Sequence, residues 1–268
     1  MREWIFCFLQ MIAYTVGVIT ACGLAVELCY RLCFLLLGRR GSRVLWYATV
    51  PLGAPVHELG HAVMCFLFCH KIEKIRLLPT KAGNACVVHT YRKHNPYAAF
   101  GNLCISIGPL LSGLSVMFLA MCFVFPRALT DYLGAVELLL ADGATLQLGE
   151  RIVAFVLGLM TEQSSPVWLR LIGAYVLFSM ALHLRLSTAD LYEMRTGIPG
   201  VLLLAALGAT VAVAWGTQVR VAMSPALREF SSIVIALFSV ILLIALIQIA
   251  LAALFRLVCV LLGIKIGG

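Results

Sequence analysis

The sequence contains very little charge. Asp, Glu, Lys and Arg make up only 12% of its 268 residues, whereas 62% are hydrophobic. Soluble globular domains carry about twice this charged fraction, so the composition excludes an ordinary soluble domain. The apolar residues also occur in blocks long enough to cross a bilayer, for which a helix needs about 20 residues. We therefore predict a multi-pass protein of the cell membrane, with the lipid bilayer as a partner.

Aspartate is scarce, and no disulfide framework is visible. The chain has three aspartates, at positions 131, 142 and 190, and its formal net charge is +8. The basic residues are scattered between the apolar blocks, which is typical of residues that set membrane topology, so we expect no nucleic-acid partner. Most of the ten cysteines lie inside the apolar blocks, where a thiol behaves as a small hydrophobic group. Their spacing does not predict disulfides.

The pattern of apolar blocks predicts an all-α polytopic membrane protein with a single integral membrane domain over residues 1–268. Residues 71–97 are more polar and contain two alternating segments around a Gly-Asn turn, which predicts a β-hairpin after the second helix. Residues 127–165 contain acidic residues and apolar pieces that are too short to cross, so we expect a linker at the membrane interface. About six transmembrane helices are predicted, at residues 4–37, 45–69, 99–125, 167–186, 201–215 and 230–263.

A His-Glu-x-x-His motif, His57-Glu58-Leu59-Gly60-His61, lies inside the second apolar block. Residues four apart share one face of a helix, so the two histidines can bind one metal ion. Glu58 is then placed to act as a general base on water. The alternative is a pair of hydrogen-bonded core histidines with a paired glutamate. Ionisable groups are costly in hydrocarbon and are usually functional there, which favours the metal site.

The positions of lysine and arginine predict the orientation. Residues 71–97 contain the densest basic cluster, whereas residues 127–165 contain only two arginines among several acids. By the positive-inside rule, the hairpin is cytosolic and the linker extracytoplasmic. With about six spans, both termini and the opening of the active site are then cytosolic. The arginines at 39, 40 and 43 argue the other way, because this topology places them outside.

A catalytic zinc site needs a third protein ligand and an open position. Asp131 and Asp142 fall in the external linker, whereas the block at 167–186 returns to the cytosolic side and leads to Asp190. We therefore predict Asp190 as the third ligand; the alternative is a solvated aspartate at a helix end. Glu193 would share its helical face but lie closer to water. His183 would lie on the same face if the helix continues, so it either orients a ligand or substrate or packs in the core.

The chain resembles a compact member of the site-2 protease family of intramembrane zinc metalloproteases. The matching parts are the motif at 57–61, the hairpin, Gly108-Pro109 in the next apolar block and Asp190 in a later one. They cover residues 44–197, which we take as the metalloprotease core. A proline inside a helix frees a backbone carbonyl, and small residues permit close helix packing. Leu191 stands where the family usually has glycine, and no asparagine follows Gly108-Pro109.

The resemblance implies roles for particular residues. The two histidines of the motif and Asp190 would bind one Zn2+ ion per chain, and Glu58 would activate water. Gly108 and Pro109 would help to align the substrate. The hairpin would present an extended membrane-protein substrate by strand addition, with residues 72–78 as the edge. The implied function is hydrolysis of peptide bonds within or next to transmembrane segments.

Two other functions fit parts of the sequence. A membrane zinc protease of the prenyl-protein class would need a glutamate as its third ligand, for which Glu193 is the candidate. A catalytically inactive metal-binding scaffold or a transporter-like protein would keep the histidines without hydrolysis. Substitution of Glu58 separates an enzyme from a scaffold, because only an enzyme needs the base.

Overall fold

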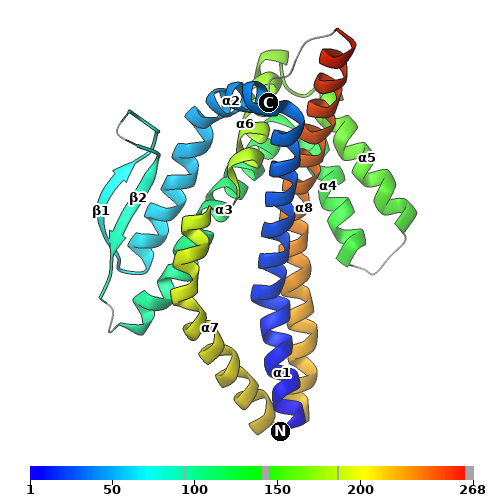
Figure 1. The fold of residues 1–268 in the computed structure, drawn as a ribbon. Helices are drawn as coiled ribbons and strands as arrows, with labels where there is room; N and C mark the ends of the chain where they lie inside the picture. The colour runs from blue at the N-terminus through cyan, green and yellow to red at the C-terminus, as the bar shows by residue number, and fades with distance from the viewer. Residues whose placement is uncertain (82, 93–94, 141–144, 186, 263–268) are drawn as a thin grey trace.

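The computed structural model describes residues 1–81, 83–92, 95–140, 145–185 and 187–262. Two strands, β1 (Lys71–Arg76) and β2 (Cys86–Thr90), form an antiparallel hairpin after the second helix (Figure 1). The predicted helical class with one β-hairpin is confirmed. The helical elements are α1 (Arg2–Ile12), the π-helical turn η1 (Ala13–Gly17), α2 (Val18–Leu67), α3 (Pro96–Val124), α4 (Pro126–Leu140), α5 (Thr145–Thr161), α6 (Val167–His183), α7 (Thr188–Ala214) and α8 (Thr217–Leu261).

Within the described residues, four helical stretches are long and apolar enough to cross a membrane: Arg2–Leu67, Tyr97–Val124, Ala189–Ala214 and Thr217–Leu261. The chain is therefore a membrane protein. The first stretch has 66 residues and is broken at Gly38, whose φ of 65° suits glycine best. Its first arm rises beside α8, and its second arm descends to the hairpin (Figure 1).

The predicted count of six spans is not confirmed. Helix α6 has only 17 residues and is not among the four stretches that are long and apolar enough to cross. The start of α1 and the end of α8 also lie at opposite ends of the molecule (Figure 1). Six alternating spans would instead bring the two ends to the same side.

The segment predicted as a linker contains two helices, α4 and α5, which pack against each other. Glu162 closes this helical pair, because its carboxylate accepts the backbone N–H of Arg127 at 3.0 Å, in the first turn of α4. Tyr132 and Phe155 are buried in the main core, and the Tyr132 hydroxyl donates to the carbonyl of Ala236 in α8. Residues 141–144, including the aspartate at 142, lie outside the described residues.

Helices α2 and α3 approach each other until their backbones touch. A Cβ atom added at Gly60 would lie 2.6 Å from the carbonyl oxygen of Gly108, and one added at Gly108 would lie 2.5 Å from that of Gly60. The hydroxyl of Ser112 in α3 donates to the carbonyl of Val56 in α2 at 2.9 Å. Only glycine leaves room for this contact, so Gly60 of the motif and Gly108 together set α3 against the metal-binding arm of α2.

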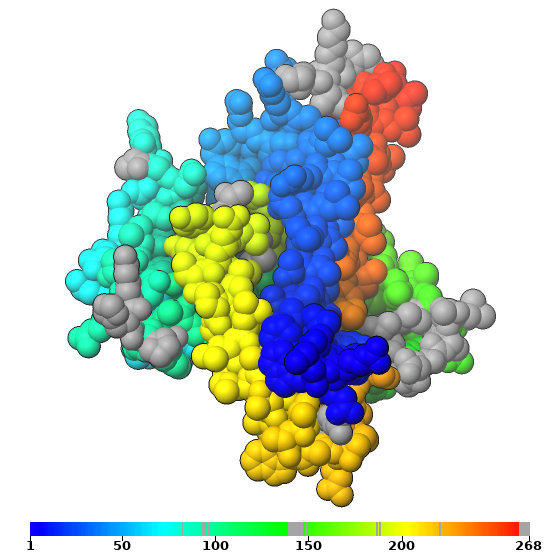
Figure 2. All heavy atoms as spheres, turned by 60° about the horizontal axis from the view of Figure 1, so that its bottom comes forward, coloured from blue at the N-terminus to red at the C-terminus, as the bar shows by residue number. Residues whose placement is uncertain are grey.

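Helix α7 packs on the opposite side of α3 and reaches α1. Gly197 lies against Leu103 of α3, so these two helices are also close. Further along α7, the indole N–H of Trp4 in α1 donates to the hydroxyl of Thr210 at 3.0 Å. Figure 2 shows α7 lying beside α1 and the first arm of α2. The helix that carries Asp190 is thus fixed along its length by α3 and α1.

Candidate metal centre

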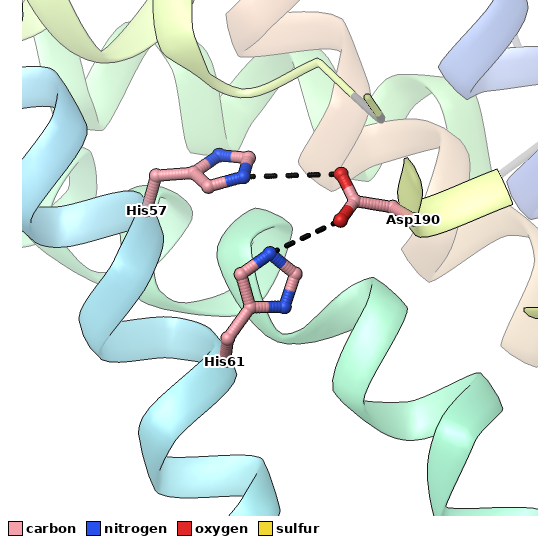
Figure 3. Close-up of side chains that lie close together, drawn as sticks. All are labelled: His57, His61 and Asp190. Atoms are coloured by element: carbon pink, nitrogen blue, oxygen red, sulfur yellow. Dashed lines mark ion pairs between the residues drawn. The ribbon is translucent and has the colours of Figure 1, made fainter. Parts of the chain in front are cut away.

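His57 and His61 project from one face of the second arm of α2, and Asp190 faces them from the start of α7 (Figure 3). His61 Nε2 lies 3.1 Å from Asp190 Oδ1, and His57 Nε2 lies 3.8 Å from Asp190 Oδ2. The site is largely shielded from solvent, because only 8% of the surface of His61 and 5% of that of Asp190 is exposed. Three candidate ligands from distant parts of the sequence therefore meet at one point.

A backbone carbonyl fixes the other ring nitrogen of each histidine. His57 Nδ1 lies 3.0 Å from the carbonyl oxygen of His183, and His61 Nδ1 lies 2.9 Å from that of Ile105. A carbonyl oxygen can only accept a hydrogen bond, so each Nδ1 must carry a proton and donate it. In the neutral ring, Nε2 then has no proton and carries a lone pair, which is the form that binds a metal.

Both carbonyl groups are available because a helix is interrupted at each of them. Ile105 stands four residues before Pro109, which has no N–H to donate to it. His183 is the last residue of α6, where carbonyl groups lack partners within the helix. Pro109 therefore releases the acceptor that orients His61. This is a specific structural role for the carbonyl that the proline was predicted to free.

Asp190 is held by a capping box at the start of α7. The hydroxyl of Ser187 accepts the N–H of Asp190 at 3.1 Å, and Asp190 Oδ2 accepts the N–H of Ser187 at 2.6 Å. The hydroxyl of Ser106 in α3 also donates to the carbonyl of Asp190 at 2.9 Å. A carboxylate in the first turn is favoured by the helix dipole. These contacts point the side chain at the two histidines.

His183 and Asp190 were expected to share a helical face only if the helix at 167–186 continues to Asp190, and it does not. Helix α6 ends at His183, and Asp190 belongs to the next helix, in which Ser187 is the N-cap. His183 does contact a candidate ligand, but through its carbonyl oxygen on His57. Its imidazole packs against Gly53 and hydrogen-bonds the carbonyl of Ser179 at 3.0 Å. His183 and Asp190 therefore do not share a helical face.

Glu58 lies beside the group. It is 7% exposed, is close to His61 and Asp190, and accepts a hydrogen bond from the backbone N–H of Val87 in β2. Glu193, the alternative third ligand, instead places its carboxylate 3.2 Å from His89 Nε2. Of the two acidic candidates in α7, Asp190 is thus the one that faces both histidines of the motif.

The residues present fit a zinc ion. Zinc bonds of about 2.0–2.2 Å in a tetrahedral site separate neighbouring ligand atoms by about 3.3–3.6 Å. One donor atom from each of His57, His61 and Asp190 lies within 4.8 Å of the other two, and the histidine nitrogens lie 3.1 Å from Asp190 Oδ1 and 3.8 Å from Asp190 Oδ2. Two imidazoles and one carboxylate are a usual ligand set for catalytic zinc, with a fourth position left for water. The group could therefore hold a metal ion.

Sequence reasoning missed several residues that shape this site. The carbonyls of Ile105 and His183 were missed because a backbone acceptor leaves no mark in side-chain type. Ser187 could have been found, since Ser-x-x-Asp at 187–190 is a capping-box pattern that predicts a helix start. Ser106 was missed as well, although its hydroxyl donates to the carbonyl of Asp190.

The sequence profile of the Peptidase M50B-like family matches residues 26–184. This is more than half of the chain, and it includes the motif at 57–61 and the Gly108-Pro109 pair, whereas Asp190 lies just beyond it. No curated protein and no solved structure matches the chain significantly. The family suggests a metalloprotease, in agreement with the resemblance to site-2 proteases. The chain belongs to the Peptidase M50B-like family.

Proposed function

We propose that the protein is an intramembrane zinc metalloprotease that hydrolyses peptide bonds within or next to transmembrane segments of membrane-protein substrates. The observation that supports this most directly is the group of His57, His61 and Asp190, whose donor atoms lie within 4.8 Å of one another. Membership of a peptidase family and the long apolar helices support it as well.

The three side chains would hold one zinc ion per chain. When bound, zinc would supply a Lewis acid that polarises the scissile carbonyl and lowers the pKa of water. The carbonyl partners at Nδ1 keep both imidazoles in the right tautomer and make Nε2 a better donor. The capping box holds Asp190 against them, so little reorganisation is needed when the metal binds.

Glu58 would carry the proton. As general base it takes a proton from the attacking water while the water oxygen adds to the scissile carbonyl carbon. It then gives that proton to the leaving nitrogen as the C–N bond breaks, so the carboxylate is regenerated. Its position beside His61 and Asp190, with little exposure to solvent, suits both steps.

The hairpin would deliver the substrate as an extended strand. A helix buries its scissile carbonyls in its own hydrogen bonds, so the substrate must unwind before cleavage. The backbone N–H of Val87 bonds to Glu58, so β2 is the strand nearer the base. We therefore favour β2, and not residues 72–78, as the strand that a substrate would extend.

The remaining features of the proposal come from the sequence. The chain would be one integral membrane domain with its core at 44–197, and the hairpin and site opening would face the cytosol because of the basic cluster at 71–97. Residues 127–165 would then lie on the extracytoplasmic side of the membrane.

The test compares wild-type protein with Glu58→Gln on a panel of substrates that carry a transmembrane segment. The substitution keeps the size of the side chain but removes the base, so zinc content and folding should be retained while cleavage falls by about 10²–10⁴-fold. Glu229→Gln, at an exposed position in α8, is the matched control and should cleave normally. A chelator should stop cleavage by the wild type, and added zinc should restore it.

The opposite pattern would support a scaffold. In that case Glu58→Gln would retain the cellular function, His57→Ala would lose it, and no substrate would be cleaved in a chelator-sensitive way.

Substrates with helix-breaking residues near the scissile bond should be cleaved best if the protein is a protease.

A further inference from the structure

A second polar cluster lies between the hairpin and α7. His89 Nε2 in β2 lies 3.2 Å from Glu193 Oε2, and His89 Nδ1 lies 3.0 Å from His70 Nδ1. His70 Nε2 in turn lies 2.8 Å from the carbonyl oxygen of Ala98, in the first turn of α3. The side chain of His89 is only 6% exposed, and His70 is buried beneath the ring of Tyr91.

The hydrogen bonds of this cluster require one extra proton. The Ala98 carbonyl can only accept, so His70 Nε2 carries a proton. One proton must also lie between the two Nδ1 atoms, and another between His89 Nε2 and the Glu193 carboxylate. Two neutral imidazoles supply only two of these three protons. The pair of rings is therefore cationic, and its charge balances the carboxylate.

This cluster joins the two halves of the proposed active site. His89 is two residues after Val87, whose N–H bonds to Glu58. Glu193 is one helical turn after Asp190 on α7. A bond between His89 and Glu193 thus ties the strand nearest the base to the helix that carries the third metal ligand, and His70 braces it against α3.

We propose that His89 and Glu193 form a proton-dependent clasp that holds the edge of β2 in register with the catalytic centre, so that both are positioning residues for the substrate strand. This inference rests on the proposed function. The other titratable groups that face the clasp are His70 and Tyr91 from the hairpin side and Cys65 from α2, which lies near Glu193.

The clasp should open as the pH rises. When the extra proton is lost, the two rings hold only two protons for three hydrogen bonds, so either the bond between His70 and His89 or the bond between His89 and Glu193 is lost. Glu193→Gln should behave differently, because its amide N–H can donate to neutral His89. This variant keeps the bond and removes its dependence on pH. Glu193→Ala removes the bond at every pH.

The experiment measures hydrogen exchange at the β2 amides, with each rate divided by the intrinsic rate of an unfolded amide at the same pH, and kcat and KM with one cleavable substrate, from pH 5 to pH 9. Wild-type protein should show β2 exchange rising about three- to tenfold at high pH and KM rising with it, since a partly exposed charge-assisted bond is lost. Glu193→Ala should show the fast exchange and high KM throughout, with kcat little changed. Glu193→Gln should show flat profiles for both. Glu229→Gln should match the wild type.

Two outcomes would overturn the clasp: β2 exchange in Glu193→Ala that equals the wild type at every pH, or a wild-type pH profile that persists in Glu193→Gln. The exchange measurement needs no substrate, so it judges the clasp even if no cleavage is found. Absence of cleavage by the wild type would count against the proposed function alone. Thermal unfolding of each variant identifies any general loss of structure.

Discussion

Pro109→Ala tests whether the proline acts on the metal centre by releasing a carbonyl. In the structure, Pro109 has no N–H for Ile105, and the free carbonyl of Ile105 lies 2.9 Å from His61 Nδ1. Alanine restores the N–H at position 109. The carbonyl of Ile105 would then be drawn back into the α3 ladder, and the hydrogen bond that orients His61 would weaken.

The expected effect on zinc is about tenfold weaker binding. Loss of a partner behind a metal-binding histidine typically costs 10–100-fold in affinity, and the lower end applies because a carbonyl can accept two hydrogen bonds. Stability should change little. The helix gains a hydrogen bond and loses a proline that costs about 3 kcal/mol, whereas removing this fully buried ring leaves a small cavity that offsets the gain.

The assay is zinc competition against a chelator of known affinity, together with thermal unfolding of the zinc-free protein. Pro225→Ala is the matched control, because Pro225 also lies inside a helix, is exposed and is remote from the metal centre. It should bind zinc as the wild type does. Unchanged zinc affinity in Pro109→Ala, or an equal loss in Pro225→Ala, would refute the role given to Pro109.

Two other predictions concern the site and its packing. Asp190→Ala should lose most bound zinc, measured by metal analysis, while Glu193→Ala keeps it; the reverse result would make Glu193 the third ligand. Gly60→Ala should destabilise the protein by about 1–3 kcal/mol in chemical unfolding, because its Cβ would meet the backbone of Gly108 at 2.6 Å. Gly149→Ala is its control, since nothing lies within 4 Å of the added atom; equal effects would contradict the close-packing argument.

Much of the fold could be predicted from hydropathy and turn residues. Long apolar blocks and the alternating segments at 71–97 are local patterns, and the hairpin and most helices formed where these patterns lie. The positions where helices end were harder to predict from the sequence. The apolar run at 167–186 passes into Asp190 without a glycine or proline, so hydropathy alone extended the helix, whereas the capping box at Ser187 starts a new one. The count of six spans is not confirmed, since α6 is not among the four stretches that are long and apolar enough to cross a membrane.

In the candidate site, too, some residues belong to a local sequence pattern and others come from distant parts of the chain. His57, Glu58 and His61 form a local pattern whose geometry is set by one helix. Asp190 was predicted as the third ligand by elimination among three aspartates, and the structure places it opposite the histidines. The contacts of His89 with Glu193 could not be predicted, because they join residues 104 positions apart. Such pairs depend on how the hairpin and α7 pack, which the sequence does not encode locally.

The metal centre lies where three helices cease to satisfy their own backbone. Helix α3 is interrupted by Pro109, α6 ends at His183, and α7 begins at Ser187. In hydrocarbon, a free carbonyl or N–H is costly unless another group in the protein bonds to it. Here the free carbonyls take the Nδ1 protons of the two histidines, and the free N–H at the start of α7 bonds to the aspartate. The same helix breaks that would destabilise a simple bundle thereby orient the candidate ligands, so removing a break should weaken metal binding more than it weakens the fold.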